Sequence, residues 1–166
     1  MDTALSILSQ VMPEEGIIFF VSMLPVVELR GAIPLAMGAF GFSPWKAAAL
    51  AVAGNIVPAI VVLWLLRVGA HAAMERIPGA RRVLEWVFER TRKRAHRTIE
   101  TYGALGLVVL VAIPLPMTGA WTGTVAAWLF DIPYRKAVGL IAVGVAIAAC
   151  IVTIASMGVI PLFSDI

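Results

Sequence analysis

Charged side chains are scarce in this chain and are missing from long stretches of it. Only 14% of its 166 residues are Asp, Glu, Lys or Arg, whereas 61% are hydrophobic and the mean hydropathy is +0.96. Segments 47–66, 101–130 and 137–164 contain none of these four residue types, and segment 16–45 contains only two. Four apolar blocks of this length exclude a soluble globular domain and predict a membrane protein.

Residues for metal, disulfide and catalytic chemistry are equally scarce. The single cysteine, Cys150, lies in an aliphatic run, which excludes an internal disulfide and a cysteine-rich metal site. His71 and His96 belong to no metal-ligand motif, and no phosphate loop, nucleophile elbow or zinc helix motif occurs. We therefore predict no enzyme, no cofactor, and no catalytic or metal-binding residue. Nucleic acid is not an expected partner, because the basic residues accompany no nucleic-acid-binding motif.

The chain repeats itself at an offset of 89 residues. At this offset Leu24-Pro25 matches Ile113-Pro114, and Pro44-Trp45-Lys46 matches Pro133-Tyr134-Arg135. In both halves a Pro-aromatic-basic triplet precedes a long uncharged run, which indicates an internal duplication. The predicted organisation is one membrane domain, 1–166, with repeat one at 14–68, a connector at 69–100 and repeat two at 101–163.

Block 101–130 is too long and too irregular for one membrane helix. As a single helix it would measure about 45 Å, against a hydrocarbon core of about 30 Å. Its middle contains the helix-interrupting residues Pro114, Pro116, Gly119 and Gly123. We therefore predict that two short arms, 103–113 and 120–130, form a re-entrant hairpin with these residues at its tip, near the membrane midplane.

Block 16–45 predicts a similar hairpin. The chain is expected to turn at 25–31, with Pro25 and Gly31 at the tip and Pro34 early in the returning helix. Each hairpin is followed by one uncharged segment long enough to cross the membrane, at 47–66 and at 137–160.

The predicted fold class is an all-α integral membrane protein, an inverted repeat of two re-entrant helical hairpins and two full transmembrane helices. One hairpin and one crossing per half invert the second half relative to the first. Connector 69–100 carries most of the basic residues, so the positive-inside rule places it in the cytoplasm. Both termini are then expected on the outer side of the cytoplasmic (inner) membrane. The alternative is four plain transmembrane helices.

The connector contains an amphipathic pattern. Val83, Leu84, Val87 and Phe88 share one helical face, while arginines, a lysine and glutamates cover the other. Attraction to anionic lipid head groups is one interpretation of this basic helix. A solvated positive-inside loop is the simpler one.

Glu28 and Arg30 are the only charged residues deep in an apolar block. A charge near the bilayer centre costs about 2.5 to 3.5 kcal/mol, so both side chains must face protein or water. In a turn between Pro25 and Pro34 both can point into one cavity. Two interpretations stay open, a substrate or proton site and a buried ion pair that only fixes the hairpin.

Uncharged polar residues complete the candidate substrate or proton site. Thr118, Thr122 and Trp121 lie in the second hairpin, where two hydroxyls and an indole can face a substrate. Asn55, beside Gly54, is a polar position in the first crossing. Packing between helices is the alternative role for each of them. The predicted site therefore comprises Glu28, Arg30, Asn55, Thr118, Trp121 and Thr122.

Segments 24–34 and 114–123, LPVVELRGAIP and PLPMTGAWTG, resemble the two signatures of the small multidrug export protein family. The resemblance covers nearly the whole chain. More distantly, the chain is similar to the DedA superfamily, whose members have two facing re-entrant hairpins and include translocases of undecaprenyl phosphate. The resemblance implies the fold given above and assigns the acidic residue of the first hairpin to Glu28. DedA proteins usually have arginines in the second hairpin; here Arg30 is the alternative anion-binding group.

The leading functional hypothesis is a small secondary transporter, proton- or ion-coupled, with a midplane cavity between the hairpins for a small or amphiphilic substrate. The alternatives are a lipid-phosphate translocase and a structural or assembly membrane protein. Expected partners are membrane lipids and a small-molecule or lipid substrate. A homo-oligomer is also expected, because small residues recur at four-residue spacing in the pairs Ala47/Ala51, Ala49/Ala53 and Gly144/Ala148.

Overall fold

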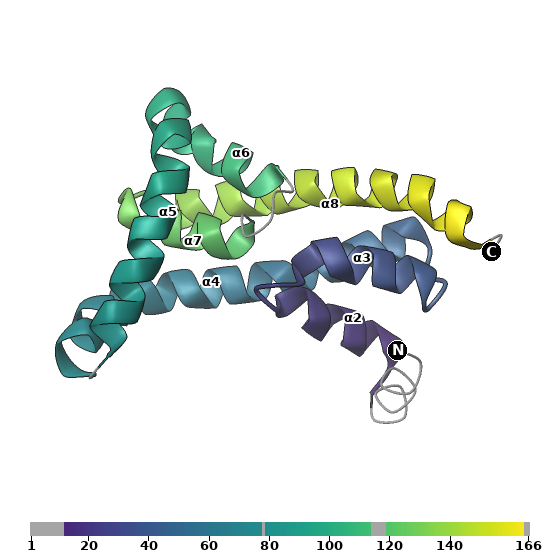
Figure 1. Ribbon diagram of the computed structural model, residues 1–166, viewed down its shortest axis with the longest axis horizontal. Coiled ribbons are helices and arrows are strands. Elements are labelled where there is room, and N and C mark those ends of the chain that lie inside the picture. Colours follow the sequence, from purple (N-terminus) through teal and green to yellow (C-terminus); the bar gives the residue numbers. More distant parts are fainter. Residues whose placement is uncertain (1–11, 78, 114–118, 165–166) are drawn as a thin grey trace. The chain divides into compact units, whose positions relative to one another are not determined.

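The computed structural model describes residues 12–77, 79–113 and 119–164, and every regular element within these ranges is helical (Figure 1). The elements are α2 (Glu14–Met23), α3 (Glu28–Gly38), α4 (Pro44–Arg76), α5 (Ala80–Tyr102), the 3-10 helix η1 (Gly103–Leu105), α6 (Gly106–Ala112), α7 (Ala120–Leu129) and α8 (Tyr134–Ser164). The all-α prediction is confirmed for this part of the chain. The predicted tip residues Pro114 and Pro116 and the candidate Thr118 lie outside the described residues.

Helices α4 and α8 are the two described helices that are long and apolar enough to cross a membrane. Their apolar spans are Pro44–Ala70 and Tyr134–Val159, 27 and 26 residues long, with mean hydropathies of 2.3 and 2.7. Only 39% of the most apolar window of each is buried, whereas the core helix of a soluble protein would be mostly buried. Four plain transmembrane helices would need two more such helices, which the described residues do not contain.

The first block is divided because a proline follows α2. Helix α2 ends before Leu24, whose backbone is extended at φ −69° and ψ 132°, and the residue before a proline is disfavoured in the helical region. Helix α3 begins at Glu28 and packs against α2. With 10 and 11 residues, the two helices are each about 15 Å long, half of a hydrocarbon core.

The predicted turn of the first hairpin at 25–31 was too long. The chain turns at 24–27, so Glu28, Arg30 and Gly31 lie in α3. Pro34 lies in the interior of α3 and not early in it. An acidic residue in the first turn favours an early helix start, because its charge stabilises the N-terminal end of the helix dipole.

The second hairpin breaks in the same way. Helix α6 ends before Ile113, which is extended at φ −74° and ψ 119° and precedes a proline as Leu24 does. Helix α7 follows Gly119, whose φ of 136° favours glycine. Gly123 was predicted at the tip but lies inside α7, where a Cβ atom would be 2.4 Å from the Cγ2 atom of Val111. Gly123 therefore allows α6 and α7 to pack closely.

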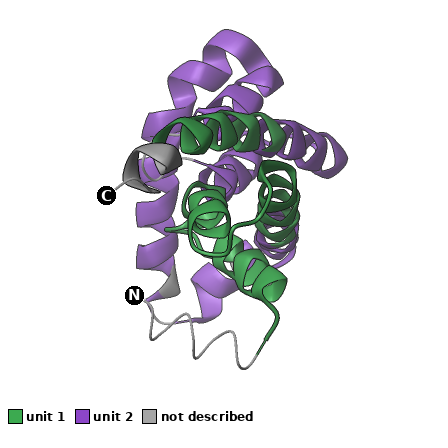
Figure 2. Cartoon of the chain, turned by 90° about the vertical axis from the view of Figure 1, so that its right-hand side faces the viewer, with its two compact units in different colours: residues 1–57, 146–166 green, residues 58–145 purple. Residues whose placement is uncertain are grey.

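The chain forms two compact units (Figure 2). Unit 1 comprises residues 1–57 and 146–166 and contains the first hairpin; unit 2 comprises residues 58–145 and contains α5 and the second hairpin. The long helices α4 and α8 each contribute one part to each unit. These boundaries differ from those of the predicted sequence repeats, which stay a prediction.

A glycine allows close packing between helices in unit 1. A Cβ atom on Gly54 of α4 would lie 2.0 Å from the Oγ atom of Ser22 and 2.3 Å from the carbonyl oxygen of Phe19, both in α2. Only glycine permits this approach of two backbones.

An equivalent contact occurs within unit 2. A Cβ atom on Gly144 of α8 would lie 2.7 Å from the Cβ atom of Val111 and 3.1 Å from the carbonyl oxygen of Val108, both in α6. The two α6 residues follow their α2 counterparts by 89 positions, and the two glycines are 90 positions apart. The same glycine-to-helix contact is thus present once in each unit.

The connector forms α5, as its amphipathic pattern predicts. Its buried residues Thr91, Ala95 and Ile99 belong to the face that packs against α6, α7 and η1. Val83 shares a helical face with Leu84, Val87 and Phe88 in the sequence pattern but is 61% exposed, because the packed face centres on Thr91 and Ala95. Phe88 remains on it, with its ring 4.6 Å from that of Trp128 in α7.

Candidate functional site

Glu28 and Arg30 lie together in the first turn of α3. Glu28 is buried, with a side-chain exposure of 6%, and Arg30 is partly buried at 21%. The Nη2 atom of Arg30 lies 3.9 Å from the Oε2 atom of Glu28, which is an ion-pair distance but too long for a hydrogen bond. Two opposite charges thus lie close together at the start of α3, within unit 1.

The backbone of Glu28 is in the left-handed region. Its φ is +48°, and Asp131 is the only other described non-glycine residue with a positive φ. This conformation costs about 1 to 2 kcal/mol for a residue with a Cβ atom. The second hairpin enters α7 through Gly119, also at positive φ. The two backbones differ, because Glu28 is the first residue of α3 at φ +48°, whereas Gly119 precedes α7 at φ 136° and ψ −160°.

Asn55 is buried in α4, next to the glycine that packs against α2. It is 0% exposed, and neither its Nδ2 nor its Oδ1 atom has a hydrogen-bond partner among the described residues. A buried polar group without a partner costs about 1 to 3 kcal/mol. The residue after Gly144 in the equivalent contact is Val145, also 0% exposed. The equivalent contact in unit 2 thus has a buried aliphatic side chain where unit 1 has a buried amide.

Thr153 of α8 was missed by the sequence analysis. It is 8% exposed, and its hydroxyl has no hydrogen-bond partner among the described residues. The available signal was a hydroxyl in an otherwise aliphatic run, which packing in membrane helices also explains.

The polar residues of the second hairpin have different surroundings. Trp121 and Thr122 are half-buried in the first turn of α7. Thr124 is fully buried, and its hydroxyl donates a hydrogen bond of 2.7 Å to the carbonyl oxygen of Ala120 within the same helix. Thr124 therefore has a local structural role. Trp121 and Thr122 belong to unit 2, whereas Glu28, Arg30 and Asn55 belong to unit 1.

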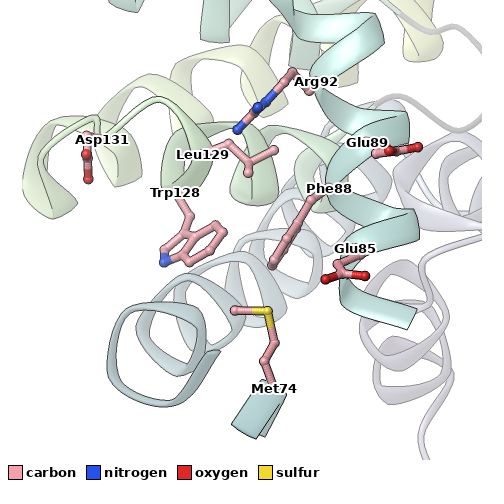
Figure 3. A pocket seen from close by; sticks show the side chains of 8 residues that line it. All are labelled: Met74, Glu85, Phe88, Glu89, Arg92, Trp128, Leu129 and Asp131. Atoms are coloured by element: carbon pink, nitrogen blue, oxygen red, sulfur yellow. The ribbon is translucent and has the colours of Figure 1, made fainter. Parts of the chain in front are cut away.

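Unit 2 contains a pocket of about 510 Å³ (Figure 3). The rings of Phe88 and Trp128 face each other in it, with the side chain of Met74 beside them (Figure 3). The remaining lining residues are Glu85, Glu89, Arg92, Leu129 and Asp131. The sequence pattern does not predict this pocket, because its lining comes from α4, α5, the end of α7 and the turn that follows it.

An ion pair joins the N-terminal ends of α2 and α4. The Nζ atom of Lys46 donates a hydrogen bond of 2.8 Å to the Oε1 atom of Glu15. The same ammonium group lies 3.9 Å from the centre of the Phe42 ring. The hydrogen bond from Lys46 lowers the pKa of Glu15 below its ordinary value.

An all-helical chain with two membrane-length apolar helices and a buried ion pair has the features of a small integral membrane protein. Residues 28–151, about three quarters of the chain, match the model of the family described as "Putative small multi-drug export protein", and the chain belongs to this family. The family and the two apolar helices indicate a membrane location, and an export protein family is not an enzyme class. No curated protein and no solved structure matches the chain.

Proposed function

We propose that this chain is a small secondary transporter of the cytoplasmic membrane, coupled to protons or another ion, that moves a small or amphiphilic substrate between its two hairpins. Glu28 carries the proposal. Its carboxyl group is buried, lies 3.9 Å from a guanidinium group and stands at a left-handed backbone position that glycine would occupy without strain. A costly residue kept at such a position indicates a role for its side chain.

The ion pair provides a simple coupling step. When Glu28 is ionised, its charge offsets that of Arg30, and the pair is stable inside the apolar unit. When Glu28 binds a proton, the guanidinium group becomes available to an anionic or hydrogen-bond-accepting group of the substrate. Proton binding and substrate binding thereby favour different states of the hairpin, which is the requirement for coupling them.

Re-entrant insertion of the hairpins is part of the proposal. Each hairpin helix is too short to cross the hydrocarbon core, and both breaks occur at the residue before a proline. The order of two short helices followed by one long helix occurs twice, and so does the glycine contact. These features support an inverted repeat with a cytoplasmic connector and polar tips near the midplane.

We also propose that copies of the chain associate. Fewer small residues are available for contact between copies than the sequence pattern suggests. Ala47, Ala51 and Ala148 are buried within the chain, and Gly144 packs on α6. Ala49 and Ala53 are exposed and lie one helical turn apart on α4. If copies of the chain associate through small residues, this pair is the surface available to them.

The transport proposal can be tested in reconstituted vesicles with an imposed pH gradient. Three probes are used: ethidium as an organic cation, carboxyfluorescein as an organic anion, and a fluorescent phosphate-bearing lipid. We expect gradient-driven movement of one of the two soluble probes by the parental protein. Glu28→Gln should abolish this movement while the protein stays folded, because glutamine keeps the shape and loses the titration. Glu75→Gln, at an exposed position of α4, is the control and should transport normally.

The same experiment separates the alternatives. Movement of the lipid probe alone would support a lipid-phosphate translocase, in which Arg30 binds the phosphate. Parental transport by the double variant Glu28→Met, Arg30→Leu would leave the pair as a structural link in the first hairpin. No movement of any probe by a folded, inserted protein would favour the structural or assembly alternative.

A further inference from the structure

The pocket of unit 2 combines half-buried apolar side chains with exposed charged ones (Figure 3). Its volume of about 510 Å³ lies within the range of about 300 to 1,000 Å³ that is typical of pockets for drug-sized ligands. The apolar lining comes from three helices and consists of Met74, Phe88, Trp128 and Leu129. The pocket can therefore cover an apolar ligand body from several sides.

Two aromatic rings, from Phe88 of α5 and Trp128 of α7, form part of this apolar lining. Their centres are 4.6 Å apart and their planes are inclined by 30°, so the rings stack on each other. The thioether of Met74 lies beside them (Figure 3). The face of an aromatic ring attracts a cation held within about 6 Å of its centre, and a thioether adapts its shape to an apolar ligand. An aromatic lining of this kind favours a ligand that combines an apolar body with a positive charge.

Carboxylates outnumber cations among the charged lining residues. Glu85, Glu89 and Asp131 are acidic, and Arg92 is basic. Arg81 donates a hydrogen bond of 2.8 Å to Glu85. Neither Glu89 nor Asp131 forms an ion pair with another residue in the described part of the chain. Two carboxylates thus stand against one guanidinium group, and the resulting field favours a cationic ligand.

The pocket lies where two apolar spans meet more polar sequence. Met74 is four residues beyond Ala70, at which the apolar span of α4 ends, and Asp131 is three residues before Tyr134, at which that of α8 begins. Tryptophan side chains such as that of Trp128 are typical of this boundary in membrane proteins. An amphiphilic cation, which also concentrates at the membrane surface, can therefore reach the pocket without crossing the membrane.

We propose that the pocket of unit 2 binds organic cations with an apolar, aromatic body, with the positive centre near Glu89 and the body against Phe88 and Trp128. The ligand class follows from two independent features of the lining, the aromatic pair and the excess of carboxylates. Glu28 and Arg30 belong to unit 1, so this site is additional to the proposed transport site. Binding is measured at equilibrium without a pH gradient, and its failure would leave the transport proposal standing.

The test compares two probes of the same shape and opposite charge, tetraphenylphosphonium and tetraphenylborate. Saturable binding of each radiolabelled probe to the purified full-length protein is measured in a nonionic detergent. We expect saturable binding of tetraphenylphosphonium, weakened by salt, and none of tetraphenylborate. Glu89→Gln should weaken tetraphenylphosphonium binding by about five- to tenfold, because it removes an exposed carboxylate beside the ligand.

Two further variants separate the charge from the ring. Arg92→Gln removes the opposing guanidinium group and should strengthen tetraphenylphosphonium binding by about threefold or more. Phe88→Leu keeps most of the apolar volume and loses the ring, so binding should weaken by about three- to fivefold. Phe88→Tyr keeps the ring and should bind like the parental protein. The two charge variants change exposed side chains, so they test the proposal even if Phe88→Leu does not fold.

Glu100→Gln is the matched control for Glu89→Gln. It also removes an exposed carboxylate from α5, but Glu100 lies about 16 Å further along the helix, beyond the screening length of about 8 Å at physiological salt. Binding should therefore stay parental. Equal effects of the two glutamine variants, weaker tetraphenylphosphonium binding by Arg92→Gln, or saturable tetraphenylborate binding would each overturn the proposal.

Discussion

Glu28 combines a buried carboxyl group with a left-handed backbone, and each feature costs free energy on its own. The side chain has 6% exposure and φ is +48°. Glycine at position 28 would adopt this backbone conformation without strain. Under our proposal, the carboxyl group is the reason for a glutamate at this position.

Glu28→Gly and Glu28→Ala separate the two contributions. Both remove the carboxyl group, so both should lose proton-coupled transport. Since only alanine keeps the backbone strain, the glycine variant should be more stable by about 1 kcal/mol in thermal unfolding. Asp131→Gly and Asp131→Ala are the matched control at φ 51° and should show the same difference in stability. Parental transport by Glu28→Gly would contradict the assignment.

Asn55→Val tests the second buried polar group. Replacing an amide without a described partner by the side chain found at Val145 should raise the free energy of unfolding by roughly 1 to 2 kcal/mol. Transport should fall, because the sequence pattern places Asn55 in the predicted substrate or proton site. The mirror variant Val145→Asn should be destabilised. A less stable Asn55→Val protein would show instead that the amide serves the fold.

At the scale of the helices, packing depends on glycines that two long helices place against two short ones. Alanine at Gly54 or Gly144 would put a methyl group 2.0 to 2.7 Å from atoms of α2 or α6. We expect a loss of roughly 1 to 3 kcal/mol for each substitution, measured by unfolding in detergent. Gly139→Ala, in the same helix α8 with no described atom within 4 Å, should be neutral or slightly stabilising. If Gly54→Ala were equally neutral, the close α2–α4 contact would be wrong.

The ion pair between α2 and α4 gives a pH-dependent link between these helices. Because the pKa of Glu15 is lowered from 4.5 by Lys46, the pair stabilises the fold above that value, and this contribution disappears as the pH falls through the lowered pKa. Lys46→Met should raise the pKa of Glu15 in an NMR titration of its carboxyl carbon. It should also reduce stability at neutral pH but not in acid. Lys136→Met removes the same charge at the start of α8 and should leave the pKa of Glu15 unchanged.

For the whole molecule, the decisive question is the number of membrane crossings. We expect cysteines at Glu75 and Asp131, both exposed, to react with a membrane-impermeant reagent from the cytoplasmic side in a Cys150→Ala background. A cysteine at Ser43 should react from the other side, because the apolar span of α4, Pro44–Ala70, lies between residues 43 and 75. A re-entrant second hairpin would return the chain to the side of the connector, so reaction of Glu75 and Asp131 from opposite sides would exclude it.

Composition and spacing alone determined the membrane class, the all-helical fold, the two long helices and the breaks in the other two blocks. These features are local: charge-free runs of sufficient length favour membrane helices, and a proline disfavours a helical residue before it. The repeated Leu-Pro and Ile-Pro steps predict both breaks, and the structure has extended residues at Leu24 and Ile113.

Other features of the protein depend on contacts between residues that are distant in the sequence, and only the tertiary structure shows them. The left-handed backbone of Glu28, the absence of a described partner for Asn55, and the close approach to Gly54 and Gly144 each depend on neighbouring helices. The packed face of α5 also depends on other helices: periodicity groups Val83 with Leu84, Val87 and Phe88, but the face in contact with α6 and α7 centres on Thr91 and Ala95. Helical periodicity shows which residues share a face, and only packing against other helices decides which face is buried.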